Sequence, residues 1–452
     1  MTVSMRVGSG QVEITPPLTI PYLAYYPRQD YFKGVHDPLY ARALVFDNGE
    51  ERLTLLCCDS IGYANHLLGP GRHFTDELRQ RVQAKTGIPP EHTMLAATHA
   101  HSVPETLGIT RLLDAPAASY WLETLLDQLA SAVQMACEDL QPSALKVGKG
   151  EVVGVGHNRR PAYTKLPLEE QIAQGRLDTQ LQVLLCQDEQ KNPRQVLINF
   201  QTHPVTVQVQ SLVSADYPGY ATALVQRSLP GCCTCAFMQG AAGNINPLRD
   251  DTRDFRDVAL YGTQVAGEAL KITCRLLGDD VPPMQDSTLA AASKRLMIPP
   301  RPLPEPGPIR ARYEAAKERE RQATDPEAKW KAGREAQVAF EALDVIERYS
   351  APQEAEVQAF RIGDLAIAAL PAEVFCEWGL RIKRESAAPH TFVSELTNGW
   401  VGYLLNPGGF AEGGYEASPG TWTQTSEEGG RLLTEGVLGL VQQLWPGGNP
   451  LT

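Results

Sequence analysis

The sequence alternates short apolar runs with amphipathic stretches of helix length, from its beginning to about residue 280. The apolar runs have the length of strands and occupy residues 43–46, 53–58, 94–97, 181–186, 196–200 and 235–238. The amphipathic stretches lie near residues 72–86, 119–139, 218–229 and 255–277. Strands separated by helices of this length form sheets with helices packed on them. The pattern therefore predicts an α/β fold, with mixed or largely parallel sheets flanked by helices.

This pattern is interrupted after residue 281. Residues 282–308 are rich in proline, including the run PPRPLPEPGP, and we expect no regular structure there. Two charged helical stretches follow, and in the second of them Asp325 and Pro326 are a favourable N-cap and first-turn pair. The large apolar residues of this second stretch recur at helical spacing and are Trp330, Phe340, Leu343 and Ile346.

We expect residues 282–350 to be an insertion, made of the proline-rich segment and a charged helical part, that packs this apolar stripe on the body of the protein. A lid or a dimer contact is the alternative. Strand-like runs return at 357–362 and 365–370. Residues 1–281 and 351–452 are therefore predicted to form one domain.

Charge and hydropathy exclude several classes of protein. The formal net charge is −12 and no basic stripe is present, which argues against a nucleic-acid-binding surface. No uninterrupted run of about 18 apolar residues occurs, so we expect no stable membrane insertion. The N-terminus has no apolar leader, and the nine cysteines are an odd number, several of them within apolar runs. We therefore expect a cytoplasmic protein, and leave open whether it forms homo-oligomers.

Polar residues follow four of the strand-like runs. Thr98-His99-Ala100-His101 follows the first, Thr202-His203 the second and the glycine-rich GAAGNINP the third, and Glu373 follows the run that ends near residue 370. In open α/β sheets, ligands bind outside the carboxyl ends of the strands. We therefore expect these side chains to converge, although they are far apart in the sequence.

The histidines among these residues favour a metal site. Residues i and i+2 of an extended chain point to the same side, so His99 and His101 are predicted to face one site. Histidine is the commonest metal ligand, and three of the nine histidines fall at equivalent strand ends. A hydrogen-bonded core role is the alternative. The glycine-rich segment lacks the spacing of a phosphate-binding loop.

Several longer motifs occur in a characteristic order. They are VGSGQVEITPP, HDPLYARALVF, THAHS, NFQTHPVTV, SADYPGYA, FMQGAAGNINP, LPAEVF and GYLLNPGGFAEGGYEAS. In this order they resemble the neutral/alkaline, non-lysosomal ceramidase family over roughly residues 6–420. The resemblance implies a ceramidase-like catalytic domain, and a hydrolase that acts on an amide bond.

The resemblance also implies the residues of the site. A single zinc ion would be held by His99, His203, Glu373 and Tyr403. The second histidine of the motif, His101, would lie near the reacting group, and Arg159 would contact the substrate. A second tyrosine of the family follows the ligand tyrosine by twelve residues, and Tyr415 stands at that position.

Two departures from the family pattern bear on the substrate. The family has a serine in a GDxSP segment, whereas the matching residues 243–247 place Asn246 there, which cannot be an alkoxide nucleophile. The chain also ends soon after the catalytic portion, without the immunoglobulin-like domain of ceramidases, and shows no secretion signal. We therefore expect ceramidase-like chemistry on a small N-acyl compound other than ceramide.

The expected mechanism is attack of metal-bound water on the amide carbonyl, because zinc lowers the pKa of bound water to about 7. Tyr415 would stabilise the oxyanion, and His101 would carry the proton to the leaving amine. Arg159 would hold a carbonyl or carboxylate of the substrate, and Asn246 would hydrogen-bond beside the reacting carbon. The alternatives are a metal-dependent ester, lactone or phosphoester hydrolase, a non-catalytic binding relative, and a structural zinc protein.

Overall fold

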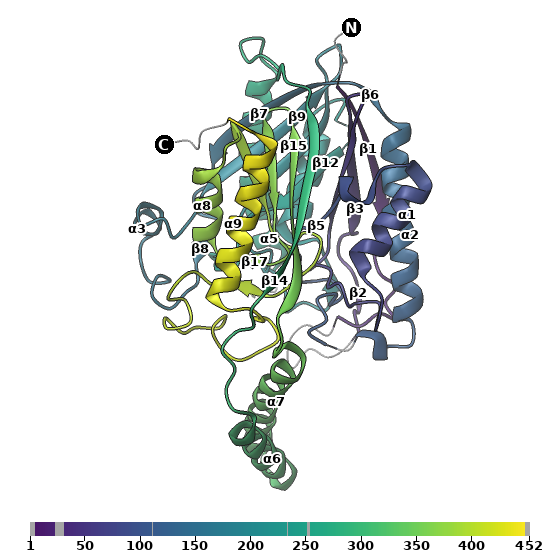
Figure 1. The fold of residues 1–452 in the computed structure, drawn as a ribbon. Coiled ribbons are helices and arrows are strands. Elements are labelled where there is room, and N and C mark those ends of the chain that lie inside the picture. The colour runs from purple at the N-terminus through teal and green to yellow at the C-terminus, as the bar shows by residue number, and fades with distance from the viewer. Residues whose placement is uncertain (1–4, 23–30, 111, 233, 251–253, 448–452) are drawn as a thin grey trace.

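A computed structural model of the chain describes residues 5–22, 31–110, 112–232, 234–250 and 254–447. Within this part of the chain, three sheets of four or five strands and three two-stranded pairs are present (Figure 1). Each of the three larger sheets combines parallel and antiparallel neighbours. The predicted α/β fold with mixed sheets flanked by helices is confirmed.

The first sheet is formed by the N-terminal part of the chain and has the strand order β5-β4-β3-β1-β6. Its strands are β1 (Arg6–Glu13), β3 (Tyr40–Asp47), β4 (Arg52–Cys58), β5 (Thr93–Ala97) and β6 (Gln141–Pro142). The helices on its outer face are α1 (Phe74–Thr86) and α2 (Ala118–Glu138). Apolar residues of both helices form one buried cluster with β3, β4 and β5.

The second sheet has the strand order β12-β10-β9-β7. Its strands are β7 (Ala144–Glu151), β9 (Gln180–Gln187), β10 (Pro193–Phe200) and β12 (Thr234–Gln239). The helices α4 (Asp216–Ser228) and α5 (Phe255–Leu276) cover it.

The third sheet has the strand order β14-β15-β16-β18. Its strands are β14 (Leu289–Ile298), β15 (Gln353–Ile362), β16 (Leu365–Ala369) and β18 (His390–Ser394). The helices α8 (Cys376–Glu385) and α9 (Glu427–Leu444) pack on it.

The inner faces of the three sheets share one central core. This cluster contains residues from all three, among them Leu55, Leu184 and Ile367. In β9, Leu184 faces the central core, whereas its neighbours Val183 and Leu185 face the covering helices. Because both faces of such a strand are buried, the strand sequences are continuously apolar instead of alternating. This is why the apolar runs were visible in the sequence.

Short elements complete the fold. The two-stranded pairs join β2 (Gly34–Val35) to β11 (Leu212–Val213), β8 (Gly156–Asn158) to β13 (Ile245–Pro247), and β17 (Glu373–Val374) to β19 (Tyr403–Leu404). The short helices are η1 (Pro90–His92), η2 (Leu112–Asp114) and α3 (Leu168–Ala173). No helix within the described ranges combines the length and the apolar character that crossing a bilayer requires.

The segment predicted to lack regular structure contains a strand. β14 lies within residues 282–308 and pairs along its whole length with β15. It is an edge strand of the third sheet, and the middle of the strand is exposed and polar. Its sequence therefore shows neither the continuous apolar run of a central strand nor a clear alternation of apolar and polar residues. Residues 289–298 therefore belong to the third sheet, and the bounds of the insertion stay a prediction.

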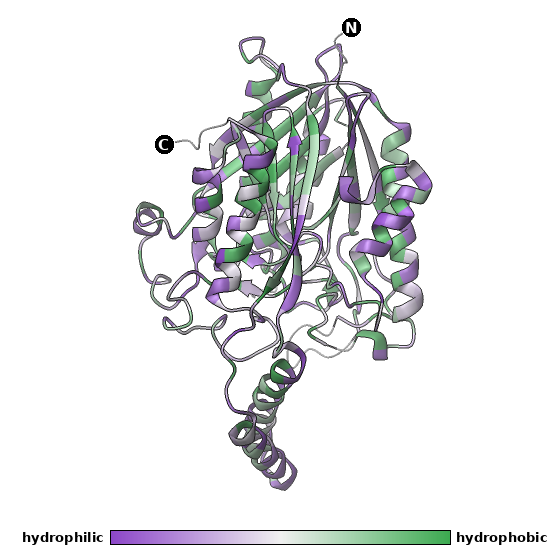
Figure 2. Cartoon of the chain, in the orientation of Figure 1, coloured by the Kyte–Doolittle hydropathy of each residue, from purple (hydrophilic) through white to green (hydrophobic). Residues whose placement is uncertain are grey.

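The helical part of the insertion extends away from the body (Figure 1; Figure 2). It consists of α6 (Pro306–Gln322) and α7 (Pro326–Tyr349), which pack on each other. The predicted packing of an apolar stripe on the body is wrong for Trp330 and Phe340, which are 54% and 45% exposed. The buried side of α7 instead carries small residues, namely Ala332, Ala336, Ala339 and Ala342. Small side chains allow close helix contact, which a search for large apolar residues overlooks.

Candidate metal centre

Three histidine side chains meet at the carboxyl ends of β5 and β10. His99 and His101 follow β5, and His203 follows β10. All three are buried, and their ligand nitrogens lie within 4.8 Å of one another. Nε2 of His99 lies 2.9 Å from Nε2 of His203 and 3.1 Å from Nε2 of His101. The structure therefore brings these three predicted site residues together.

The backbone fixes which ring nitrogens face each other. Nδ1 of His99 lies 2.7 Å from the carbonyl oxygen of Ile61, and Nδ1 of His203 lies 2.7 Å from that of Ala242. A carbonyl oxygen can only accept, so each Nδ1 carries the hydrogen and each neutral ring presents a lone pair at Nε2. Two lone pairs at 2.9 Å repel each other unless a cation binds both. The donor set therefore fits a transition-metal ion such as zinc.

Glu373 brings a carboxylate to the histidines. Its Oε2 lies 3.3 Å from Nε2 of His99 and 3.2 Å from Nε2 of His203. Burial acts to raise the pKa of Glu373, but positive charge at the adjacent His99 and His203 outweighs it and holds this pKa well below its usual range, as the charge of a bound metal ion would. Burial, and then the positive charge of Arg159, lower the pKa of His203 to about 4. An ionised carboxylate and neutral imidazoles are the protonation states that metal binding requires.

Tyr403 is paired with Glu373 in register, because β17 and β19 run parallel with these two residues opposite each other. The buried ring of Tyr403 lies 6.4 Å from the ring of His203, measured between centroids. The guanidinium carbon of Arg159 lies 5.4 Å from the centroid of the Tyr403 ring. All four residues of the predicted ligand set thus lie in one region, and their role as ligands stays a prediction.

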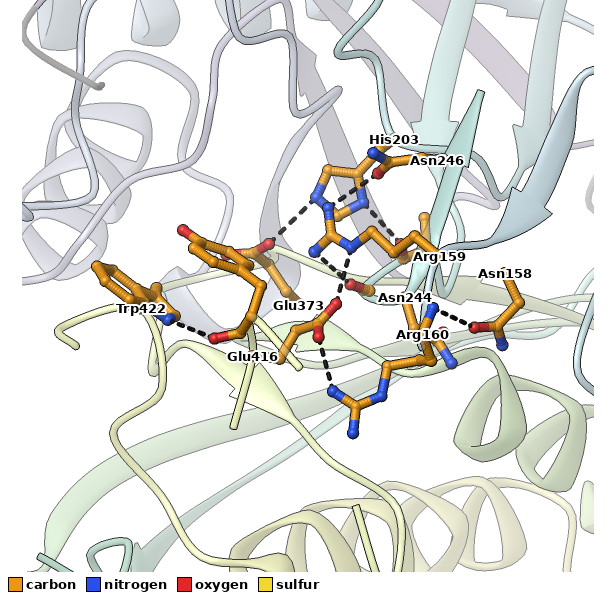
Figure 3. Close-up of polar contacts among 12 residues, drawn as sticks. Asn158, Arg159, Arg160, His203, Asn244, Asn246, Glu373, Glu416 and Trp422 are labelled. Carbon is orange, nitrogen blue, oxygen red and sulfur yellow. Dashed lines mark hydrogen bonds and ion pairs between the residues drawn. The ribbon is translucent and has the colours of Figure 1, made fainter. Parts of the chain in front are cut away.

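Arg159 directly follows β8 and connects the β8–β13 pair to the C-terminal loops (Figure 3). Its Nε donates to Glu416 Oε1 at 2.8 Å, and its Nη1 donates to Asn246 Oδ1 at 2.8 Å. Its Nη2 donates to the carbonyl oxygen of Gly243 at 2.9 Å. The other oxygen of Glu416 accepts from Arg160 at 2.7 Å, so that one buried carboxylate serves two arginines. The predicted pair of Arg159 and Asn246 is therefore in direct contact, and Glu416 is an addition that the sequence did not indicate.

Tyr415 lies at the outer edge of this group. It is 47% exposed, and its ring stacks on Trp422 with centroids 4.9 Å apart and an interplanar angle of 15°. The Tyr415 ring lies 6.0 Å from the ring of Tyr403 and 5.8 Å from the guanidinium carbon of Arg159. The structure therefore places Tyr415 beside two predicted site residues, with part of its ring open to solvent.

The backbone at His99 corrects one step of the sequence argument. We expected an extended chain to point His99 and His101 to the same side. β5 ends at Ala97, however, and His99 adopts the left-handed conformation, with a φ of 67°. The two rings still meet, with centroids 4.5 Å apart, because of this turn and not because of strand alternation. Left-handed conformations of residues other than glycine cost about 1–3 kcal/mol and cluster at functional sites.

A buried segment, residues 395–400, contacts several parts of the site and was not predicted. Trp400 donates from its indole Nε1 to Glu373 Oε1 at 3.0 Å. Asn398, with a φ of 61°, donates its backbone N–H to the carbonyl oxygen of Leu95 and accepts from the backbone N–H of Leu95. Glu395 accepts two backbone hydrogen bonds near the ligands. The signal before this segment is weak, because β18 contains only two consecutive apolar residues, Phe392 and Val393.

The fold and the histidine–glutamate cluster together define the class of this protein: an α/β protein with a candidate metal centre at the carboxyl ends of its strands. The family model described as neutral/alkaline non-lysosomal ceramidase, N-terminal, matches residues 5–249, which is more than half of the 452 residues. The chain belongs to this family, which confirms the resemblance read from its motifs. Glu373, Tyr403 and Tyr415 lie outside the matched residues.

Individual relatives agree with this assignment. The neutral ceramidase of Drosophila melanogaster is 25% identical over 265 residues, which are 55% of this chain and 36% of that protein. The neutral ceramidase of Pseudomonas aeruginosa is 27% identical over 255 residues, 54% of this chain and 37% of that protein. The matched part of the chain thus spans just over a third of the length of these relatives.

A solved structure shows the same fold. The crystal structure of the neutral ceramidase from Pseudomonas aeruginosa superposes with a TM-score of 0.75 at 19% identity, covering 100% of this chain and 76% of that one. A structure described as ceramidase complexed with C2 gives a TM-score of 0.74 at 18% identity. The ceramidase-like fold that the motifs implied is therefore confirmed.

Proposed function

We propose that this protein is a zinc-dependent hydrolase that cleaves the amide bond of a small N-acyl compound. The observation that carries the proposal is the meeting of His99, His101, His203 and Glu373, with three Nε2 atoms and one carboxylate oxygen facing one another. Membership of the family supports amide hydrolysis, since the relatives are neutral ceramidases. The fully buried donor set supports a tightly held ion.

The predicted ligands are His99, His203, Glu373 and Tyr403. Zinc bound there would supply Lewis acidity and water with a pKa of about 7. His101 is then left for proton transfer, because its Nε2 lies beside the ligand group and its side chain is almost fully buried. We assign it the delivery of a proton to the leaving amine.

No side chain is required as a nucleophile in this proposal. Asn246 occupies the position where the family has serine, and an amide cannot act as an alkoxide. Its oxygen accepts from Arg159, and its nitrogen donates to Asp250. This arrangement holds the Asn246 side chain in one orientation, and supports a role in binding the substrate beside the reacting carbon.

Arg159 and Tyr415 would bind the substrate. Glu416 is shared between Arg159 and Arg160, and Glu412 lies 3.6 Å from Arg160. The planar guanidinium fork of Arg159 can bind a carbonyl of the substrate, or a carboxylate through two hydrogen bonds. Tyr415, half exposed beside Arg159, is the candidate donor to the oxyanion.

The alternatives differ in the bond that is cleaved. The same groups would serve a metal-dependent ester, lactone or phosphoester hydrolase, and a binding relative would hold the metal without turnover. We favour the amide because the family relatives are ceramidases. A cytoplasmic location stays part of the proposal, supported by the buried thiols of Cys57, Cys58, Cys186, Cys235 and Cys376.

The test combines metal analysis with matched substrates. Purified protein is analysed for zinc, and hydrolysis is measured on a short N-acyl amino acid, on the ester with the same acyl group, and on micellar ceramide. We expect equimolar zinc and a preference for the N-acyl amino acid. His99→Ala should remove zinc and activity together, whereas His390→Ala, at the start of β18, should keep both. Preference for ceramide would refute the proposed substrate, and turnover without metal would refute the proposed mechanism.

A further inference from the structure

Glu395 is a buried carboxyl group that the proposed chemistry does not use. It follows the last residue of β18, and its side chain is fully buried. Its Oε2 accepts the backbone N–H of Val374 at 2.8 Å and the backbone N–H of Ala242 at 3.1 Å. Its own backbone N–H donates to the carbonyl oxygen of Gln239, at the end of β12. Glu395 thus joins three strand ends.

Both backbone groups that Glu395 binds belong to the turns that orient predicted ligands. The carbonyl oxygen of Ala242 accepts from Nδ1 of His203 and so fixes its ring and tautomer. Val374 is the neighbour of Glu373 in β17. One carboxyl oxygen of Glu395 therefore links the carbonyl group that orients His203 to the backbone that carries Glu373. The Nε2 of His203 and the Oε2 of Glu373 lie 3.2 Å apart as a result of this arrangement and its neighbours.

The surroundings of Glu395 are unusual for a residue that only stabilises the fold. Among the described residues, its Oε1 has no hydrogen-bond partner. Burying a carboxyl group with half of its hydrogen-bonding capacity unused is costly. Both hydrogen bonds of Oε2 go to backbone N–H groups beside the predicted metal ligands, those of Val374 and Ala242. The stabilisation that offsets the cost of burial therefore acts on the backbone of the metal centre.

We propose that Glu395 is a positioning residue for the metal centre, which holds His203 and Glu373 in mutual register through the backbone at Ala242 and Val374. The inference rests on the metal-binding part of the proposed function. It does not depend on which bond the enzyme cleaves.

The test compares two substitutions that differ only in hydrogen bonding. Glu395→Gln keeps an oxygen that can accept from both backbone N–H groups. Glu395→Met has a similar length but no such acceptor, and it leaves both buried N–H groups unpaired. Zinc affinity is measured by competition with a chromophoric chelator, and thermal unfolding is followed in excess chelator. We expect Glu395→Met to weaken zinc binding roughly 10–100-fold, as loss of an outer partner of a ligand does, and Glu395→Gln to bind nearly as tightly as the wild type.

Asp47 provides a control far from the metal centre, at the other end of the first sheet. It is 3% exposed, accepts the backbone N–H of Gly49 at 2.8 Å, is also paired with Arg6 and Arg52, and ends β3 on the side away from the histidines. Asp47→Leu should lower the unfolding temperature of the metal-free protein without changing zinc affinity, and Asp47→Asn should have the smaller effect.

The outcomes separate this inference from the proposed function. If Glu395→Met binds zinc as tightly as the wild type, or if Asp47→Leu weakens zinc binding as much, the positioning role is refuted while the metal centre stands. If the wild type does not bind zinc, both fail. Should Glu395→Met not fold, Glu395→Ala replaces it, because the smaller side chain admits water to the two N–H groups, and the same criteria apply.

Discussion

The indole N–H of Trp400 donates to Oε1 of Glu373 at 3.0 Å, while Oε2 of the same carboxylate lies 3.3 Å and 3.2 Å from the histidines His99 and His203. The two oxygens of Glu373 therefore have different partners. Trp400 occupies one of them and turns the other toward the metal site. This division favours a carboxylate that binds a metal through a single oxygen.

The first prediction follows from this hydrogen bond. Trp400→Phe removes the donor, keeps an aromatic ring and leaves a buried oxygen of Glu373 unpaired. We expect zinc affinity to fall by roughly 10-fold or more, because the carboxylate can then rotate. Chelator competition measures the change. Trp378→Phe is the matched control, since it loses a buried indole hydrogen bond of 3.1 Å to the carbonyl of Leu405. Equal losses of affinity in the two variants would contradict the prediction.

The second prediction concerns Asn246. If it binds the substrate and is not a nucleophile, Asn246→Ala should lower kcat/KM by roughly 10–100-fold, the loss expected for one or two hydrogen bonds to the transition state. Activity should remain measurable, and the zinc content should stay unchanged. Mass spectrometry during turnover is the second readout. A covalent acyl-enzyme on any side chain would count decisively against direct attack by water.

The third prediction concerns Arg159, whose guanidinium contacts Glu416, Asn246 and Gly243. Arg159→Lys keeps the positive charge but loses the planar fork of donors. With an N-acyl amino acid we expect KM to rise more than kcat falls, because the substrate carboxylate loses a two-bond contact. The carboxamide analogue of the same substrate is the control. If both compounds lose the same factor, Arg159 does not bind the carboxylate.

The fourth prediction uses the buried carboxyl of Asp216, at the start of α4. Burial raises the pKa of Asp216 from its ordinary value of 3.8 to about 6. A folded-state pKa above the unfolded value means that the folded protein holds this proton more tightly. The contribution to stability is therefore complete below about pH 3.8, and is lost as the pH rises through about 6. The difference of about two units corresponds to about 3 kcal/mol.

Asp216→Asn tests the predicted direction of this pH dependence of stability. Asparagine cannot ionise, and it tolerates the left-handed backbone of this position, where φ is 53°. The free energy of unfolding is measured in urea from pH 4 to pH 7.5, with chelator present for both proteins. The stability of Asp216→Asn relative to the wild type should increase across this range by about 3 kcal/mol. A constant difference would show that Asp216 does not titrate there.

Much of the fold could be predicted from the sequence. The buried strands of the three sheets are apolar on both faces, so residues such as Leu184 and Val183 lie in continuous runs that local inspection finds. The exceptions have physical causes. β14 is an exposed edge strand, and α7 buries alanines, so neither shows a run of large apolar residues.

The site was predictable where chemistry follows a recognisable strand. His99, His101, His203 and Glu373 each stand just after an apolar run, and the structure brings them together. Glu395 and Trp400 were missed because β18, the strand before them, has only two consecutive apolar residues and so shows no apolar run. Glu416 lies in a loop, and its partner Arg159 is 257 residues away, with no local pattern linking them.

The sequence by itself determined the α/β class, the strand ends that carry polar groups and the family to which the chain belongs. These properties follow from local patterns, because apolar runs and the order of motifs can be recognised in the linear sequence. Only the tertiary structure decided which oxygen of Glu373 faces the histidines, how the left-handed backbone at His99 turns its ring, and which buried groups support the ligands. Such relations depend on distances between atoms of different strands, to within fractions of an ångström. Glu373 and Trp400, for example, are 27 positions apart and become partners only once β17 and β19 have paired.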